Sequence, residues 1–478
     1  MTLSNLGLKR YKFPDCFLAK KGYYLEEKMK KVDIVVIGGS AAGITAAITA
    51  KKYYADKEIL MIKNVVNVPI PCGIPYMFGS VDDPSKNALP TDKMMAANNI
   101  AVLQDEVSQI NRLNKTLVTK NGEEVAYDKL ILGTGSLPVV PRLPGIDLGH
   151  VYPIIKNIDV IKNMINEVKN GQNFVIIGGG FIGVEMAEEL KKMKPEASVT
   201  IVEMQNHCLQ LVYDEDFGIL AEEALKAQNI KLITGETVVS LEGHDVVTGV
   251  KLASGLEIKA DRVVLGIGST PNVALAKSCD LVIGPARGVA VNRYMQTSDP
   301  DIFACGDVAD KISFFDGKPS ALRLASIATA EARIAGANLY QLKRVNQGAI
   351  GVFSTFIGKK TFAAAGLTVR DAVARGYQVI ASDAEAINRH PGAMPGAENL
   401  KVRLIFEKGS KVLLGGQVYG AVSGGELINV IGALVAGKVT AEDIVLFQAG
   451  THPALTASPV AYQLVNAAEN ALVKLLKE

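Results

Sequence analysis

Two stretches of the chain follow the same order of residue types: a short run of branched apolar residues, a group of glycines, and a helix-like segment. The apolar runs cover residues 34–37 and 174–177. An unbroken run of this kind is typical of a parallel strand that is covered on both faces. The helices are expected at residues 44–52 and 184–192. The pattern therefore predicts two strand–turn–helix units whose first glycines are 140 residues apart.

The last block of the chain, residues 345–478, has a different order. Its apolar runs come as a set of strands followed by a set of helices, which favours an α+β domain over a third unit of the first kind. The expected strands and then helices are residues 402–406, 412–414, 417–419, 426–434 and 460–476.

The glycines between strand and helix indicate a dinucleotide site. The first allows a tight turn, the second lets the backbone approach a pyrophosphate, and the third lets helix and strand pack closely. The pyrophosphate then meets the free N–H groups at the start of the helix. The second turn has this spacing in full, whereas Ser40 replaces the second glycine of the first turn. The residues expected to bind the two dinucleotides here are Gly38, Gly39, Ser40, Ala41, Ala42, Gly43, Gly178, Gly180, Ile182 and Gly183.

The two units differ at the end of their next strand. In the second unit, residues 199–202 end at Glu203, 20 residues after Gly183. A carboxylate there binds a ribose diol and repels a 2′-phosphate, so NADH is favoured and NADPH is the alternative. In the first unit, residues 59–62 are followed by Lys63, and the expected acid is missing.

Composition narrows the function classes. Lys and Arg number 51 and Asp and Glu 49, which gives a net charge of +2. This balance offers no basic excess for a nucleic acid or an anionic membrane. The longest membrane-like uncharged run, residues 34–50, contains three glycines and is shorter than the about 20 apolar residues of a spanning helix. The five cysteines form no CxxC pair, so we expect no metal site and a reducing compartment, the cytoplasm.

Three further segments complete the pattern. Residues 129–136 read as a strand that ends in a Gly-Thr-Gly-Ser turn, residues 266–272 repeat such a small-residue turn, and residues 302–307 are a strand that ends in Gly-Asp. This ordered set resembles the pyridine nucleotide–disulfide oxidoreductases, which are flavoproteins with two dinucleotide-binding domains, and the resemblance covers about residues 31–470. It implies FAD in the first domain and NAD(P)H in the second.

The resemblance also implies site residues and domains. Asp307 is expected to hydrogen-bond the FAD ribityl chain, and Glu185 to lie close to the nicotinamide. The cofactor is further expected beside Thr134, Gly135 and Gly268. We expect an α/β chain with two Rossmann-like domains and a C-terminal α+β dimerisation domain. The boundaries are 1–30 for an N-terminal extension, 31–150 and 276–344 for the two parts of the FAD domain, 151–275 for the NAD(P)H domain and 345–478 for the dimerisation domain.

Cys72 is the candidate redox residue. It lies between prolines and is followed by Gly73 and a Pro-Tyr pair, where a helix is expected to begin. A thiol at a helix N-terminus has a lowered pKa, and its thiolate is the nucleophile. The segment resembles the single-cysteine branch of the family, the coenzyme A-disulfide reductases and NAD(P)H persulfide/polysulfide reductases. Met77 excludes the branch with two cysteines.

His452 is the candidate acid/base. Thr451-His452-Pro453 resembles the segment by which lipoamide dehydrogenases and relatives send a histidine across a homodimer, although the carboxylate that normally follows is absent. A histidine with a pKa near neutrality can protonate a leaving thiolate. His390 is a weaker candidate for the same role.

Together these residues predict an FAD enzyme that passes electrons from NAD(P)H through Cys72 to a disulfide, persulfide or polysulfide such as coenzyme A disulfide. One alternative is an electron-transfer subunit that serves a ferredoxin-like iron–sulfur partner. Another is an NADH oxidase, although that branch carries a histidine in the first glycine turn where this chain has Ala41.

Overall fold

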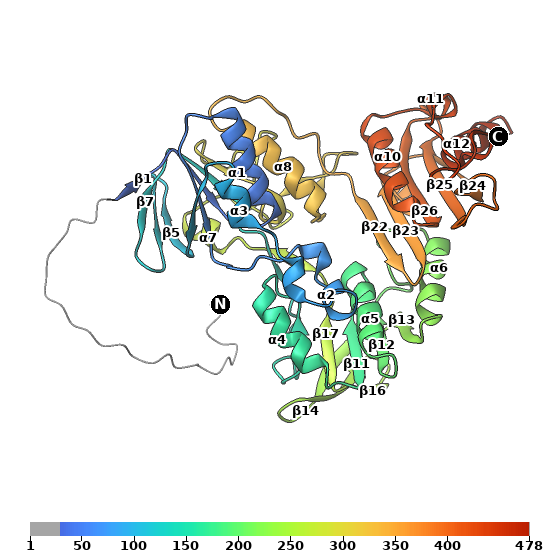
Figure 1. The fold of residues 1–478 in the computed structure, drawn as a ribbon, viewed down its shortest axis with the longest axis horizontal. Helices are drawn as coiled ribbons and strands as arrows, with labels where there is room; N and C mark the ends of the chain where they lie inside the picture. Colours follow the sequence, from blue (N-terminus) through green and yellow to red (C-terminus); the bar gives the residue numbers. More distant parts are fainter. Residues whose placement is uncertain (1–28, 478) are drawn as a thin grey trace, which may run out of the picture.

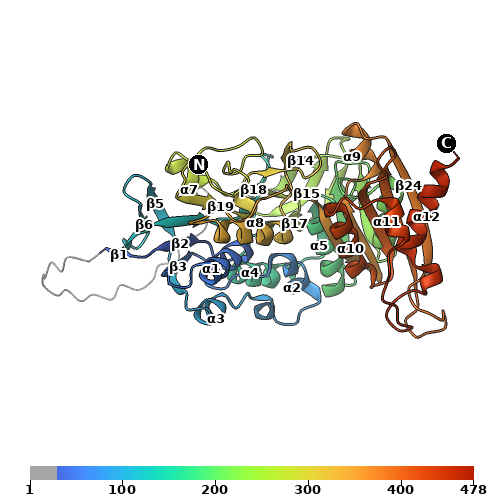
Figure 2. The same cartoon turned by 90° about the horizontal axis from the view of Figure 1, so that it is seen from above.

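The computed structural model describes residues 29–477, so residues 1–28 of the expected N-terminal extension lie outside the described chain. Three five-stranded sheets with their helices form most of the part of the molecule that is described (Figures 1 and 2). Within residues 29–477, no helix has the length and apolar character needed to cross a membrane.

The first sheet is wholly parallel and draws on two distant parts of the chain. Its neighbouring strands are, in order, β19 (Ile302–Ala304), β8 (Lys129–Leu132), β2 (Ile34–Ile37), β3 (Ile59–Lys63) and β4 (Ala101–Gln104). Every residue of β2 and β3 is buried, as expected for strands covered on both faces. Helices α1 (Ala41–Tyr53) and α8 (Ala325–Ala337) lie side by side on this sheet in both views.

The second sheet repeats this plan. Its neighbouring strands are, in order, β10 (Val151–Pro153), β17 (Arg262–Leu265), β11 (Asn173–Ile177), β12 (Ser198–Glu203) and β13 (Ile230–Thr234). The helices of this part of the chain are α4 (Ile158–Val168), α5 (Phe181–Met193) and α6 (Glu215–Lys226). Two short strands, β9 (Ser136–Pro138) and β18 (Ser269–Pro271), pair antiparallel where the chain passes between the two sheets.

The third sheet is antiparallel, which agrees with the expected α+β block. Its order is β22 (Val352–Ile357), β23 (Lys360–Gly366), β26 (Leu413–Gly420), β25 (Asn399–Glu407) and β24 (Val379–Ile387). Its helices are α10 (Gly424–Ala436), α11 (Ala441–Val445) and α12 (Gln463–Leu475). The expected strands 412–414 and 417–419 form the single strand β26, and the sequence reading missed β22, β23 and β24.

Smaller elements complete the fold. The first two domains each contain an additional small sheet. These are β1 (Lys30–Lys31) with β5 (Val107–Asn111), β6 (Thr116–Thr119) and β7 (Glu124–Ala126), and β14 (Val238–Gly243) with β15 (Val247–Leu252) and β16 (Glu257–Lys259). The short helices and remaining strands are α2 (Tyr76–Gly79), α3 (Thr91–Ala96), α7 (Ala274–Ser278), α9 (Val369–Ala374), β20 (Lys311–Ile312) and β21 (Pro319–Ser320).

Both helices that follow the glycine turns begin three residues earlier than predicted, at Ala41 and Phe181. The third glycine of each motif is therefore inside the first turn of its helix. A Cβ atom on Gly43 would overlap the carbonyl oxygen of Gly38, and one on Gly183 would overlap that of Gly178. The missing side chain lets each helix start directly against its strand, so its free N–H groups face the turn.

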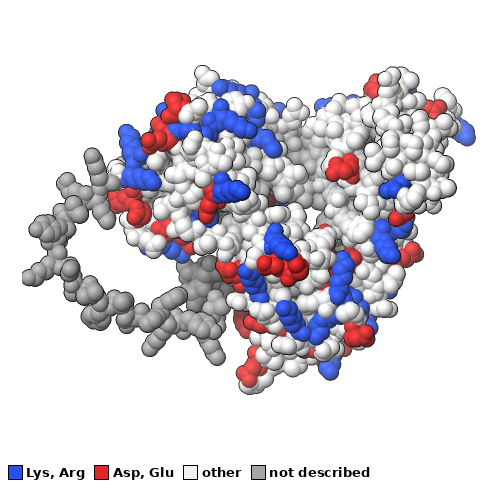
Figure 3. All heavy atoms as spheres, viewed as in Figure 1, with Lys and Arg blue, Asp and Glu red and all other residues white. Residues whose placement is uncertain are grey.

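Charge is distributed without a continuous basic surface on the face drawn in Figure 3. Basic and acidic side chains are interspersed over the two parallel-sheet domains, whereas the part around α10 is mostly uncharged. Several large apolar side chains of the C-terminal domain are well exposed. Among them are Val422, Leu446, Leu455 and Val460.

Candidate active site

The first glycine turn is crossed closely by two other backbone segments. Gly38 has φ +120° and a Cβ on it would overlap the carbonyl oxygen of Gly133, at the end of β8. A Cβ on Gly306 would lie 2.7 Å from the Cβ of Ala42 in α1. The start of α1 is therefore lined by main chain, and such a cradle fits a pyrophosphate.

The second glycine turn has the same form. Gly178 has φ +104°, and a Cβ on it would lie 2.7 Å from the carbonyl oxygen of Gly266. Space is open around Gly180, and the side chain of Ile182 in the first turn of α5 is 38% exposed. The main-chain cradle of this turn also fits a pyrophosphate.

Glu203 is held against the second turn. Its carboxylate accepts hydrogen bonds from the backbone N–H of Gly179 and, at 2.7 Å, from that of Gln205. The side chain is buried at the end of β12. Both oxygens keep lone pairs for a further donor.

Lys63 takes the matching place in the first domain. Ile62 pairs with Ile37 as Val202 pairs with Ile177, so Lys63 and Glu203 occupy the same register position. The Lys63 ammonium contacts Asp92 of α3 at 3.0 Å, with only 2% of the Lys63 side chain exposed. At the end of β3, where a carboxylate was expected, the chain therefore has Lys63. This lysine forms an ion pair with the carboxylate of Asp92, which comes from α3.

The two linkers between the domains are tied to each other near the expected cofactor contacts. Thr134 donates its hydroxyl to the carbonyl of Asn272 at 2.8 Å, and the Asn272 N–H donates to the carbonyl of Gly135 at 2.9 Å. Gly135 and Gly268 have φ values of +69° and +94° and open space where a side chain would lie. Backbone is therefore accessible at both positions.

Asp307 is part of a three-residue polar group. Its Oδ2 accepts from the Ser136 hydroxyl at 2.7 Å and from the Lys156 ammonium at 3.0 Å. Burial alone would raise the pKa of Asp307, but the charge of Lys156 and the Ser136 hydrogen bond hold it below its usual value. The carboxylate is therefore ionised and fixed in orientation. Lys156, which the sequence reading did not single out, comes from the loop after β10.

Cys72 lies on a 3₁₀ turn (Pro71–Gly73) and is accessible to solvent. Its pKa is raised, first by partial burial of the sulfur and then by the charge of Glu185, against the opposing charge of Lys156. The prediction of a lowered pKa was wrong for this chain. The following helix α2 spans only Tyr76–Gly79 and begins after the cysteine, so its dipole does not act on the sulfur.

Glu185 connects the second turn to the third sheet. It follows Gly183 in α5, and its Oε1 accepts from the hydroxyl of Thr355 in β22 at 2.9 Å. Burial raises the pKa of Glu185 to about 7, opposed by that hydrogen bond and assisted by Glu188 and Glu189. This carboxyl group therefore exchanges a proton near neutral pH.

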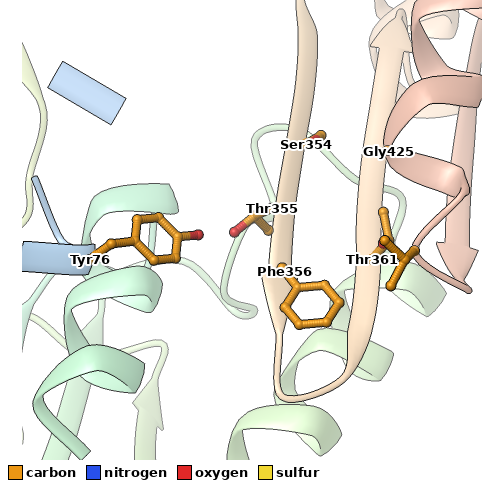
Figure 4. A pocket seen from close by; sticks show the side chains of 7 residues that line it. Tyr76, Ser354, Thr355, Phe356, Thr361 and Gly425 are labelled. Atoms are coloured by element: carbon orange, nitrogen blue, oxygen red, sulfur yellow. The ribbon is translucent and has the colours of Figure 1, made fainter. Parts of the chain in front are cut away.

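A pocket of about 370 Å³ opens beside this carboxyl group. Figure 4 shows the hydroxyl of Tyr76 pointing toward Thr355 across it. Because Tyr76 is four residues after Cys72, the pocket lies next to the cysteine segment. The residues that line it are Tyr76, Ser354, Thr355, Phe356, Thr361, Val422 and Gly425.

His452 lies in the loop between α11 and α12 and is exposed. Its Nδ1 accepts from the N–H of Ala454 at 3.2 Å. His390 is close by, because its Nδ1 lies 3.0 Å from the carbonyl oxygen of Thr456. The helices α11 and α12, which flank this loop, lie apart from α2 in both views.

The remaining cysteines are not accessible thiols where they are described, and the described residues hold no cluster of metal-ligating side chains. Cys208, Cys279 and Cys305 are buried, and Cys16 lies outside the described residues. In the part of the chain that the structure describes, no group of three or more His, Cys, Asp or Glu side chains is arranged to hold a metal ion.

The sequence of this chain matches two models of one protein family. The pyridine nucleotide-disulphide oxidoreductase model matches residues 32–332, and the dimerisation domain of the same family matches residues 352–461. This chain belongs to that family. Membership confirms the expected α/β fold class, the oxidoreductase class, and FAD and NAD(P)H as cofactors.

Three similar proteins illustrate the range of the family. An NADH oxidase of Methanocaldococcus jannaschii is 30% identical over 92% of this chain and 99% of its own length. An NAD(P)H coenzyme A polysulfide/persulfide reductase of Pyrococcus horikoshii is 30% identical over 87% and 93%. The structure of an NAD-dependent persulfide reductase from A. fulgidus superposes with a TM-score of 0.85, at 28% identity over 92% of this chain and 83% of its own.

Proposed function

We propose that this flavoprotein passes two electrons from NAD(P)H, with NADH favoured, to a disulfide, persulfide or polysulfide such as coenzyme A disulfide. The observation that carries the proposal is the position of Cys72. It is the one accessible thiol among the cysteines of residues 29–477, and its pKa responds to Glu185, Lys156 and Asp307. The names of the Pyrococcus horikoshii and A. fulgidus relatives support a sulfur acceptor.

FAD, when bound, supplies two-electron transfer between a nicotinamide and a sulfur centre. We assign it to the first glycine turn, with Asp307 as a further contact, and NAD(P)H to the second turn with Glu203. The early starts of α1 and α5 supply main-chain N–H groups for the two pyrophosphates. Ionised Asp307 accepts hydrogen bonds from ligand hydroxyl groups while Lys156 and Ser136 fix its orientation.

Cys72 carries the covalent step. Its thiolate attacks one sulfur of the acceptor, so that a mixed disulfide forms on Cys72 and the other sulfur leaves as a thiolate. Two electrons from NAD(P)H and one proton then cleave the mixed disulfide, restore the Cys72 thiolate and release the second thiol. The leaving thiolate takes the other proton. One NAD(P)H and one proton thus reduce one disulfide to two thiols.

A proton donor is needed for the leaving thiolate. We infer that His452 of a second copy supplies it, since α11 and α12, the helices that flank its loop, lie apart from α2 within one chain. The match to the family's dimerisation domain and the exposed apolar side chains Leu446, Leu455 and Val460 support a homodimer. The free thiols favour the cytoplasm as the compartment.

The test is the anaerobic oxidation of NADH with coenzyme A disulfide or polysulfide. Replacement of Cys72 by Ser is expected to abolish turnover of both acceptors without loss of bound flavin. The matched control is Cys279→Ser, which changes a buried thiol and should leave the rate unchanged. Equal rates for Cys72→Ser and the native enzyme would overturn the thiol mechanism.

Oxygen reduction is the second candidate function, because the Methanocaldococcus jannaschii relative is named an NADH oxidase and this chain matches it over nearly its whole length. The same assay in air distinguishes the two. A rate with oxygen that exceeds the rate with every sulfur acceptor would favour the oxidase. The iron–sulfur partner stays a prediction from the sequence.

A further inference from the structure

We propose that Asp92, held in place by Lys63, is the carboxylate that binds the adenosine ribose of FAD. This rests on the proposed assignment of FAD to the first glycine turn. It moves the acid that the dinucleotide fold normally carries at the end of the second strand to the start of α3, which lies about 30 residues further along the chain.

The first step of the argument is the internal comparison with Glu203. The place of a Cβ on Gly179 is shared by the Cys208 Sγ, at 2.8 Å, and the Glu203 side chain, whose Cβ and Oε2 both lie at 3.1 Å. The place of a Cβ on Gly39 is filled by the Lys63 stem, whose Cδ and Cβ lie at 2.8 and 2.9 Å. Glu203 and Lys63 both lie against their glycine turns, and they bring opposite charges.

The second step is that Lys63 cannot substitute for the acid as an acceptor. An ammonium group only donates hydrogen bonds. Its Nζ is already directed to Asp92 at 3.0 Å and to the carbonyl oxygen of Val66 at 3.1 Å. A lysine this deeply buried needs a partner, because an unpaired buried charge is costly. Lys63 thus links Asp92, through its Nζ, to the side chain that lies against the Gly39 turn.

The third step concerns the anchoring of α3. Thr91 precedes Asp92 in that helix, is 2% exposed, and donates its hydroxyl to the carbonyl of Gly39 at 3.0 Å. In the second domain the carbonyl of Gly179 receives the N–H of Leu209 instead. The side chain next to Asp92 is therefore bonded directly to the glycine turn, which ties the start of α3 to that turn.

The fourth step is that Asp92 has capacity left for a ligand. Its side chain is 67% exposed, and only Oδ1 meets Lys63. Within residues 29–477, Oδ2 accepts no hydrogen bond, and the N–H of Gly39 has no acceptor, whereas the N–H of Gly179 is taken by Glu203. An ionised carboxylate and a free N–H at one turn can serve both a donating and an accepting ribose hydroxyl.

The experiment measures FAD affinity of the full-length holoenzyme by dialysis against graded FAD concentrations, with bound flavin read from its absorbance. Asp92→Asn is expected to weaken FAD at least about tenfold, because a hydrogen bond to a charged group is lost. The matched control is Asp82→Asn, since Asp82 is also exposed and paired with a lysine, Lys86. It should change the affinity less than twofold.

An FAD analogue without the adenosine 2′-hydroxyl, and one without the 3′-hydroxyl, locate the contact. The native enzyme should prefer FAD over at least one analogue, and Asp92→Asn should lose that preference. A rescue makes the test specific: Lys63→Glu added to Asp92→Asn should regain affinity, because a carboxylate then meets the Gly39 N–H as Glu203 meets Gly179. Lys63→Met added to Asp92→Asn should not.

The outcomes separate the two proposals. If Asp92→Asn binds FAD and both analogues as Asp82→Asn does, the ribose assignment is overturned while the proposed function stands. If the native enzyme holds no flavin at any FAD concentration, the proposed function fails and the ribose assignment fails with it. Failure of Lys63→Glu to rescue while it stays folded in thermal unfolding also counts against the ribose assignment.

Discussion

The two dinucleotide turns of this chain share a backbone and differ in their side chains. Gly38 and Gly178 both have φ above +100°, and Gly43 and Gly183 both allow a helix to start against the carbonyl of the first glycine. The strand that follows ends in Lys63 in one case and in Glu203 in the other. The difference teaches that sterics require glycine at the first and third positions of each turn. On the proposed assignment to Asp92, the ribose contact instead moves to another element.

The largest effect is expected where the two turns agree. Gly43→Ala places a methyl group on the Gly38 carbonyl oxygen, so the enzyme should lose its flavin entirely. Gly183→Ala should abolish NADH oxidation while flavin is retained. Flavin content and NADH turnover are the measurements. Gly218→Ala in α6 is the control, because a Cβ there would make only ordinary contacts at 3.5 Å, and a loss as complete as that of Gly183→Ala would contradict the steric account.

The next effect concerns a buried ion pair at the first domain. Lys311 and Glu331 are 2% and 3% exposed and 3.1 Å apart, and both bind the backbone of Gly306, which precedes Asp307. Lys311→Met leaves Glu331 without its partner and should lower the free energy of unfolding by about 3–5 kcal/mol. Denaturant unfolding measures it. Lys360→Met breaks an exposed pair with Glu398 and should cost less than about 1 kcal/mol; equal losses would refute the distinction.

A third prediction tests Glu203, the acid that lies against the second glycine turn. Glu203→Gln weakens the hydrogen bonds to its backbone donors and to the ribose, so the KM for NADH should rise about 10- to 100-fold with a smaller change in kcat. Steady-state kinetics provide the values. Glu257→Gln, an exposed residue on β16 of the same domain, should leave the KM unchanged. A lower kcat at constant KM in Glu203→Gln would place this residue elsewhere than on the ribose.

The smallest effect arises from another difference between the turns. Two residues after Gly183 stands Glu185, and two residues after Gly43 stands the uncharged Thr45. The pKa of Glu185 is about 7, so the carboxylate is charged where the Cys72 thiol titrates, and a negative charge disfavours the thiolate. Glu185→Gln should therefore shift the pH profile of Cys72 alkylation to lower pH, with a few-fold faster reaction at pH 8. A shift to higher pH would contradict this sign.

The sequence predicted the parts of the molecule that local sterics dictate. Glycine spacing predicted both turns, and unbroken apolar runs predicted β2 and β11, because these features need no distant partner. The sequence pattern did not predict the strands β22 to β24. β23 contains three consecutive alanines, and β24 carries Ser, Asp and Glu, so neither has a clear strand pattern by itself.

The missed site residues are those that the tertiary fold brings together. Thr355 meets Glu185 across 170 positions of sequence, and Lys156 meets Asp307 across 151. Lys63 was noted as a departure, but its partner Asp92 belongs to a six-residue helix that only packing brings to the turn. The raised pKa of Cys72 has the same origin, since burial and Glu185 act on it through space.

The central claim is that Cys72 forms a mixed disulfide with the acceptor. The most direct measurement is mass spectrometry of the enzyme after anaerobic exposure to coenzyme A disulfide, before and after NADH is added. The account predicts one coenzyme A thiol attached to the peptide that contains Cys72, its removal by NADH, and two thiols released per NADH consumed. Turnover of the disulfide with Cys72 never modified would contradict it.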